Sequence, residues 1–229
     1  MRASYAGAGE RCHTAAGLQR SAAACRACPA MVPGSAVLDL PPGPRPLLFI
    51  GEAPGRLGAA RTGVPFSGDA AGARFERLLA EAGLSRADAA VTNAVLCLPL
   101  DERGRNRRPR PAEVRACAGY LRAVLELARP RLVVPLGAVA LAALAAIEPH
   151  GLVLARDAGR PVPWRGRWLM PLYHPAARSA VRRPLPQQVE DWRRLGAFAA
   201  RLQAAQNPVD DTGIEKLRCL HPAEEASDA

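Results

Sequence analysis

The chain has 229 residues, of which 49% are hydrophobic and 23% charged, and it carries a formal net charge of +10. These values are typical of a globular protein with one core, and no apolar run reaches the ~20 residues that cross a bilayer. The N-terminal segment lacks the apolar core of a signal peptide, so we expect a cytoplasmic protein with no membrane segment. The last 23 residues carry −4, which leaves +14 on the rest. This charge predicts a polyanionic partner, with nucleic acid as the first candidate.

Strand-like and helix-like segments alternate along the chain. The stretch "LLFIG" is short, apolar and ended by glycine, as a buried strand is, whereas "RPAEVRACAGYLRAVLELARP" has helix boundaries at Pro111 and Pro130. Strands are predicted at 47–51, 89–97, 131–137 and 167–175, and helices at 71–84, 110–130, 138–147 and 185–205. This alternation predicts an α/β fold of three layers, α/β/α, with a central, mostly parallel four-stranded sheet.

Composition divides the chain into three expected parts. We expect an N-terminal extension over residues 1–24, one domain with helices and strands over 25–206, and an acidic, disordered tail over 207–229.

A glycine-rich stretch, "GEAPGRLGAARTGVPFSGDAAG" at 51–72, follows the first predicted strand. It contains neither GK[ST] nor G-x-G-x-x-G, and its carboxylates Glu52 and Asp69 argue against a phosphate ligand. In parallel sheets, ligands bind beyond the carboxyl ends of the strands. We therefore expect this stretch, Asn93 and His174 to meet in one crevice.

The cysteines are candidate metal ligands. Disulfides are not expected in a cytosolic protein, and a C-x-x-C pair with two later cysteines has the ligand count of an iron–sulfur or a zinc centre. The candidate ligands are Cys25, Cys28, Cys97 and Cys117. Ordinary buried thiols are the alternative, Cys12 and His13 could replace one ligand, and Cys219 is expected to be free.

Several motifs together resemble one known family. "FIGEAPG", "GVPFSGDAAG", "TNAVLC", "RPAEVRAC", "LGAVAL" and "YHPAA" occur in the order found in the iron–sulfur uracil-DNA glycosylases, over residues 25–198. "GEAPG" is similar to family 4 and "RTGVPFSGD" to family 5. The resemblance implies the uracil-DNA glycosylase fold, and it implies that the four candidate cysteines hold a structural [4Fe–4S] cluster.

The resemblance also implies a pocket for a uracil flipped out of DNA. Phe66 would stack on the base, the Asn93 amide would read its edge, and His174 would donate to uracil O2 as negative charge grows there. Gly51 and Gly55 would let the backbone approach the base. The expected base-binding residues are Gly51, Glu52, Ala53, Gly55, Phe66, Asn93 and His174.

The residue that activates water is an open choice at this point. The position that holds aspartate in the G-x-D-P motif of other uracil glycosylases is Ala53 here. Asp69 lies at the family 5 position and is the preferred general base, Glu52 is the alternative, and electrostatic catalysis without a base is the third possibility. Asp69 is also well placed to cap the helix that follows it.

The expected activity is hydrolysis of the uracil N-glycosidic bond in single- or double-stranded DNA, as the start of base excision repair. Arg178, Arg182 and Arg183, in the segment after His174, are the expected DNA contacts, and an arginine-rich loop at 103–110 is expected to be exposed. A monofunctional monomer is expected. Two alternatives are a broader glycosylase for hypoxanthine or xanthine and a protein that binds uracil or abasic DNA without turnover.

Overall fold

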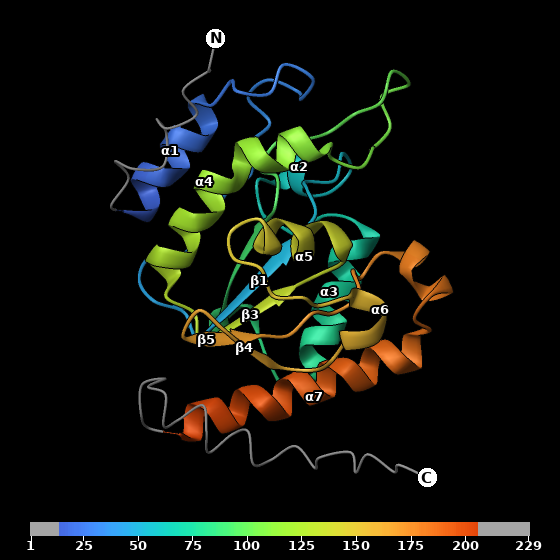
Figure 1. Ribbon diagram of the computed structural model, residues 1–229. Helices are drawn as coiled ribbons and strands as arrows, with labels where there is room; N and C mark the ends of the chain where they lie inside the picture. Colours follow the sequence, from blue (N-terminus) through green and yellow to red (C-terminus); the bar gives the residue numbers. More distant parts are fainter. Residues whose placement is uncertain (1–13, 206–229) are drawn as a thin grey trace.

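The computed structural model describes residues 14–205, and Cys12, His13, Cys219 and the predicted tail lie outside the described residues. Figure 1 shows helices on both sides of a central sheet. The helices are α1 (Ala15–Ala24), α2 (Ala59–Thr62), α3 (Ala70–Glu81), α4 (Pro111–Ala128), α5 (Ala138–Ala145), α6 (Leu154–Asp157) and α7 (Leu185–Ala204), with 3-10 turns η1 (Arg86–Asp88) and η2 (Ala177–Val181). The strands are β1 (Leu47–Gly51), β2 (Ala89–Asn93), β3 (Leu132–Pro135), β4 (Val162–Trp164) and β5 (Arg167–Leu169).

The sheet within residues 14–205 has the strand order β2-β1-β3-β5-β4. Strands β2, β1, β3 and β5 are parallel, and β4 pairs antiparallel with β5. The prediction of a mostly parallel sheet is therefore confirmed, with one strand more than expected. Strand β4 forms a hairpin with β5, whose turn residues Arg165 and Gly166 both have positive φ. That geometry matches the right-handed twist of paired strands.

Alternate residues of the strands face opposite layers. Leu48 and Ile50 of β1 lie in a buried cluster with α1, α4 and α5, whereas Leu47 and Phe49 lie in a second cluster with α3 and α7. This period of two is the geometry of a strand buried on both faces. The three-layer α/β/α arrangement is confirmed, and its two cores meet at the sheet.

Helices α3 and α7 lie unusually close together. A Cβ atom on Gly196 of α7 would collide with the Ala82 carbonyl that ends α3. Phe49 stacks on Trp192 with ring centroids 5.4 Å apart, which fixes α7 against the centre of the sheet. Helix α7 is therefore rigidly packed, and the segment before it, which contains the predicted DNA contacts, is anchored at its C-terminal end.

Residues 15–24, assigned to an N-terminal extension by the sequence, form α1. Its Leu18 is fully buried, and the Tyr120 hydroxyl of α4 lies 3.1 Å from both the hydroxyl and the carbonyl oxygen of Ser21. Helix α1 thus packs against the helix that carries Cys117.

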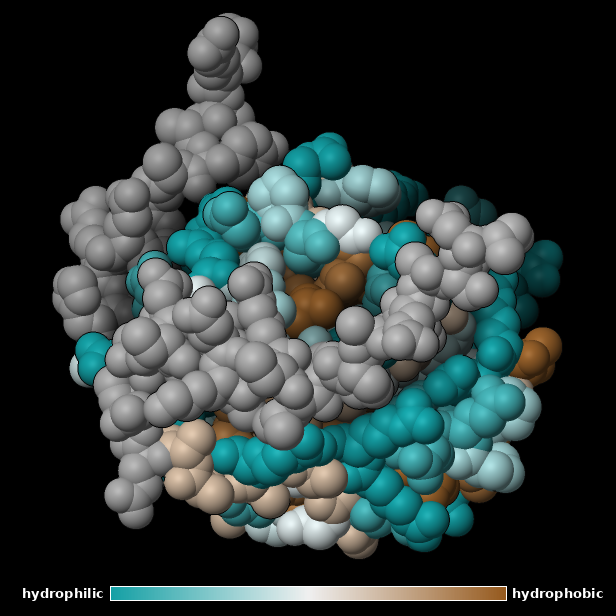
Figure 2. Space-filling model, turned by 60° about the horizontal axis from the view of Figure 1, so that its bottom comes forward, coloured by the Kyte–Doolittle hydropathy of each residue, from teal (hydrophilic) through white to brown (hydrophobic). Residues whose placement is uncertain are grey.

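The face on which α7 lies is mostly hydrophilic, with hydrophobic residues gathered in a hollow (Figure 2). None of the helices within residues 14–205 is long and apolar enough to cross a membrane.

Candidate active site

A pocket of about 150 Å³ opens beyond the carboxyl ends of the parallel strands. Asn93 ends β2, His174 follows β5, and Phe66 and Asp69 come from the glycine-rich stretch between β1 and α3. The lining residues that the sequence had singled out are Glu52, Ala53, Gly55, Phe66, Asp69, Asn93, His174 and Arg178. The fold therefore gathers in one pocket the residues that the chain order separates.

Phe66 forms an apolar wall and is held in an unusual backbone conformation. Its φ is +51°, in the left-handed region that bulky residues avoid, and its carbonyl accepts a hydrogen bond of 2.7 Å from Arg86. Its ring stacks on Phe75 at 4.7 Å. A Cβ on Gly72 would lie 2.5 Å from the Phe66 carbonyl oxygen, so glycine is required beneath this turn. The position of Phe66 is thus fixed by the packing of its ring on Phe75 and by the hydrogen bond from Arg86 to its backbone carbonyl.

Asn93 and Phe66 converge over Gly51. A Cβ on Gly51 would overlap the Asn93 carboxamide oxygen and would lie 2.8 Å from two ring carbons of Phe66. Asn93 is only 4% exposed, and no hydrogen bond to another described side chain occupies its amide. Asn93 lines the pocket, so its amide is available there to a polar planar ligand.

His174 is held as a neutral imidazole. Its Nδ1 accepts a hydrogen bond of 3.1 Å from the backbone N–H of Ala176, which leaves the proton on Nε2. Burial, with a smaller effect of the Arg178 charge, lowers the pKa of His174 from 6.5 to about 4. The ring lies 5.3 Å from that of Phe66. His174 is therefore a neutral hydrogen-bond donor at physiological pH.

Asp69 has one oxygen engaged and one directed at the glycine-rich stretch. Oδ1 accepts a hydrogen bond of 2.9 Å from Gly72 N–H, which caps α3 as the sequence suggested. Oδ2 fills the space where Gly55 and Gly58 would carry Cβ atoms, at 2.9 Å from that position on Gly55. Asp69 thus serves as a helix cap and also lines the pocket.

Glu52 is tied to the segment after β5. Its Oε2 lies 3.3 Å from Nη2 of Arg178, and the two side chains are 19% and 70% exposed. This ion pair joins the β1 loop to η2. It engages the Glu52 carboxylate, while none of the described cations pairs with Asp69.

Asn106 and Arg107 also line the pocket, although the sequence did not single them out as site residues. Asn106 Oδ1 accepts a hydrogen bond of 3.0 Å from Arg56 N–H, so its NH₂ group is free to donate on the side of Gly55. Both belong to the loop at 103–110, in which Arg107 is half-buried while its neighbours are exposed. A lone asparagine among arginines gave no signal that the loop folds back onto the pocket.

The three arginines expected to bind DNA have different surroundings. Arg178 lines the pocket and pairs with Glu52, and Arg182 is exposed. Arg183 instead makes a two-pronged contact with Asp191 of α7, at 2.6 and 2.9 Å, and Asp191 is 1% exposed. Arg183 is therefore engaged in fastening the segment to α7.

A second cavity, of about 230 Å³, is lined by four cysteines from three parts of the chain. Burial, with a smaller effect of the neighbouring cysteines, raises the pKa of the Cys117 thiol to about 12 and the pKa of the Cys97 thiol to about 11. Within residues 14–205, no three side chains of the His, Cys, Asp and Glu types converge closely enough for a single metal ion. The four cysteines Cys25, Cys28, Cys97 and Cys117 surround a space instead.

Comparison with known proteins agrees with this architecture. The sequence pattern described as "Uracil DNA glycosylase superfamily" matches residues 39–196. The chain belongs to this superfamily. The resemblance found in its motifs is confirmed, and so is the fold class.

Named relatives cover most of the chain. A type-4 uracil-DNA glycosylase of Thermotoga maritima is 34% identical over 66% of this chain and 76% of its own. A type-4 enzyme of Archaeoglobus fulgidus is 35% identical over 69% and 78%, and a type-5 enzyme of Thermus thermophilus is 38% identical over 56% and 63%.

Proposed function

We propose that this protein is a uracil-DNA glycosylase that flips uracil out of DNA and hydrolyses its N-glycosidic bond. The observation that carries the proposal is the meeting of Phe66, Asn93, His174 and Asp69 in one pocket beyond the strands. The relatives named above are uracil-DNA glycosylases, and these names favour neither of the two alternatives that the sequence left open. The substrate is DNA, in agreement with the positive charge of the chain.

Recognition of uracil follows from the shapes and donors of two side chains. Phe66 offers a flat wall against which a planar base stacks. The Asn93 carboxamide provides an acceptor for uracil N3–H and a donor for O4. Cytosine presents an acceptor and a donor at the corresponding positions, so it does not match an amide that offers its oxygen to N3 and its NH₂ group to position 4. Gly51 admits both side chains to this position.

Bond cleavage leaves negative charge on the departing base, and His174 is suited to stabilise it. The neutral imidazole donates from Nε2, and its orientation is fixed beforehand by the hydrogen bond from Ala176 N–H. A donor aimed at the site where charge develops lowers the barrier without reorganisation.

The geometry favours Asp69 over Glu52 as the group that handles water. Asp69 Oδ2 borders the pocket beside Gly55, whereas the Glu52 carboxylate is paired with Arg178. Asn106 can donate its amide N–H to a water molecule that in turn donates to Asp69, which orients the oxygen for attack on C1′.

We also propose that the four cysteines hold a [4Fe–4S] cluster. The donor set is all thiolate, as such clusters require, and it surrounds a cavity of about 230 Å³. A zinc ion would need four sulfurs at about 2.3 Å around one point. When bound, the cluster would crosslink the segments that carry these cysteines, and no step of the reaction passes through it.

We also propose an oligomeric state, a location and the DNA contacts of this protein. We expect a monomeric cytoplasmic protein whose domain extends over residues 25–206, with helix α1 (Ala15–Ala24) packed against it. Arg178, which lines the pocket, and the exposed Arg182 are the proposed phosphate contacts. Affinity for DNA should then fall steeply with salt, because arginine–phosphate contacts release counterions.

The test is excision from a labelled oligonucleotide that carries one uracil, followed by alkaline cleavage at the abasic site. Wild type should cleave, Asp69→Asn should lose most activity, and Glu52→Gln should retain it. Hypoxanthine DNA in parallel measures the broader activity. A folded wild-type protein that retains uracil DNA without releasing the base would refute the proposed reaction. Full activity of Asp69→Asn would refute only the role given to Asp69 and would leave the proposed reaction in place.

A further inference from the structure

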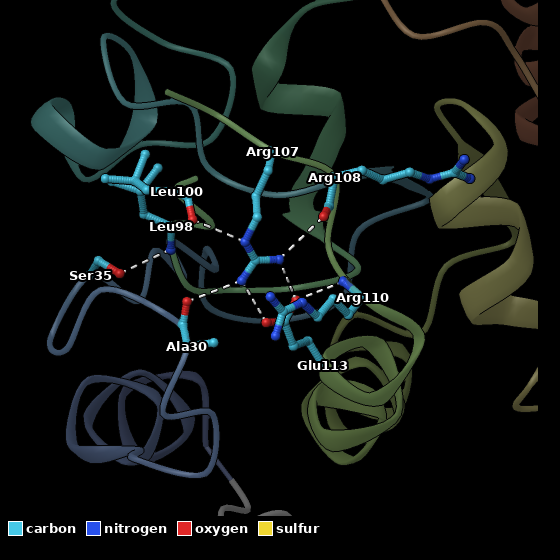
Figure 3. A network of polar contacts seen from close by, with 8 residues as sticks. All are labelled: Ala30, Ser35, Leu98, Leu100, Arg107, Arg108, Arg110 and Glu113. Atoms are coloured by element: carbon cyan, nitrogen blue, oxygen red, sulfur yellow. Dashed lines mark hydrogen bonds and ion pairs between the residues drawn. The ribbon is translucent and has the colours of Figure 1, made fainter. Parts of the chain in front are cut away.

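A buried ion pair lies between the base pocket and the cysteine cavity. Arg107 contacts the Glu113 carboxylate at 2.6 and 2.8 Å, and their side chains are 16% and 8% exposed (Figure 3). Removing two charges from water is costly, so such a pair is maintained only where further hydrogen bonds satisfy both groups. Those further bonds lead to the cysteine-bearing segments.

Two of them connect Arg107 to the backbone beside the cysteines. Its Nη2 donates to the carbonyl of Ala30, two residues after Cys28, at 3.0 Å. Its Nε donates to the carbonyl of Leu100, three residues after Cys97, also at 3.0 Å. One guanidinium therefore holds two separate cysteine-bearing segments at once.

Glu113 provides the third connection. It lies in the first turn of α4, and Cys117 follows it by about one turn of the same helix. Its Oε2 also accepts a hydrogen bond of 2.6 Å from Arg110 N–H, which fixes the end of the 103–110 loop. Arg107 and Glu113 thus bind together the chain segments that surround the cysteine cavity.

The same arginine also reaches the active site. Arg107 lines the base pocket, and it directly follows Asn106, whose amide borders Gly55. A displacement of the Ala30 or Leu100 backbone must therefore move either the ion pair or this wall of the pocket, because a planar guanidinium cannot keep all of its hydrogen bonds after a shift.

We propose that the Arg107–Glu113 pair couples the cysteine centre to the base pocket, with both residues acting as positioning residues. The inference rests on the uracil pocket and the cluster proposed above. Coupling between two sites is reciprocal, so a uracil base in the pocket should stabilise the cluster, just as the cluster stabilises the pocket.

The experiment measures cluster loss rather than activity. Purified, cluster-loaded protein is incubated to a constant signal at increasing concentrations of an iron chelator, and the visible absorbance of the remaining cluster is measured. One sample contains an oligonucleotide with 2′-fluoro-2′-deoxyuridine, which resists glycosidic cleavage, and a second contains the same oligonucleotide with thymidine. In wild type the uracil analogue should raise the chelator concentration that removes half of the cluster by about fivefold or more relative to thymidine, the lower end of typical coupling.

Glu113→Gln should reduce this protection to less than twofold. It leaves the side-chain shape and removes the charge opposite Arg107. The matched control is Glu190→Gln on α7, because Glu190 forms an exposed pair with Arg194. This control should keep the full protection. Arg107→Lys, which keeps the charge and loses the planar fork, should give less protection than wild type.

Two results would overturn the inference: equal protection in wild type and Glu113→Gln, or no protection in wild type. Should Glu113→Gln be isolated without a cluster, Arg107→Lys decides by the same comparison, and the wild-type measurement is independent of both variants. Uracil excision is assayed on the same wild-type preparation. A protein that excises uracil but fails the protection test refutes the coupling alone, whereas a protein without excision refutes the proposed function.

Discussion

Acidification from pH 7 to pH 5 should destabilise wild type more than a His174→Gln variant. The pKa of His174 is lowered from 6.5 to about 4 by burial, so the unfolded chain takes up a proton in this range and the folded chain does not. Since the folded pKa is the lower one, the stability contribution of neutral His174 is complete above pH 6.5 and is lost as the pH falls toward 4. Linkage between these two pKa values gives a loss of about 2 kcal/mol at pH 5.

The assay is urea denaturation of both proteins at pH 7, 6 and 5. The gap between their free energies of unfolding should change by about 2 kcal/mol in favour of the variant, because glutamine does not titrate. The other titratable groups are common to both proteins and cancel. A gap that stays constant across this range would refute the depressed pKa. In wild type, the excision rate should also show no inflection near pH 6.5 that belongs to His174.

Three further outcomes follow from the packing of the site. Gly51→Ala should lower the single-turnover excision rate by about 100-fold, because the new methyl group overlaps the Asn93 amide; a rate within threefold of wild type would contradict this. Asn93→Asp should lower uracil excision by at least about tenfold, since the donor to O4 is lost, and single-turnover rates at saturating enzyme would measure it. Arg183→Ala should lower the free energy of unfolding by about 3 kcal/mol, because it leaves Asp191 buried without its partner. Arg182→Ala should change it by less than about 0.5 kcal/mol, and equal effects in urea denaturation would contradict the assignment.

The sequence predicted the layers and the elements that carry the site, because hydrophobic period and helix boundaries are local signals. It missed β4, whose three residues include Pro163 and leave no recognisable alternation. Strands β2 and β5 are also shorter than predicted, at 89–93 and 167–169. In each case the apolar residues that follow the strand are buried in the core but belong to a loop, so the apolar pattern extends beyond the strand's C-terminal end.

The partners of the arginines could not be predicted. Charge alone made Arg183 and Arg107 resemble their exposed neighbours, and both are instead in buried or partly buried ion pairs. Their carboxylate partners lie six and eight residues further along the chain, in the helices that follow, and nothing in the local pattern distinguishes these carboxylates from exposed ones. Composition predicts that a segment is basic, but it does not say which of its charges face solvent.

The glycines of the 51–72 stretch illustrate the same limit at the centre of the site. Their expected role was to let the backbone approach a ligand, yet the space of the missing Cβ atoms is taken by site side chains: Phe66 and Asn93 over Gly51, and Asp69 over Gly55 and Gly58. None of these three glycines has a positive φ, although Gly58 at the start of α2 has φ −112° and ψ −111°, a combination that other residues avoid. At these positions the site packs directly onto glycine, whereas Gly63 and Gly68 of the same stretch have the positive φ of turn residues. Substitutions there should therefore change the catalytic geometry before they change the flexibility of the loop.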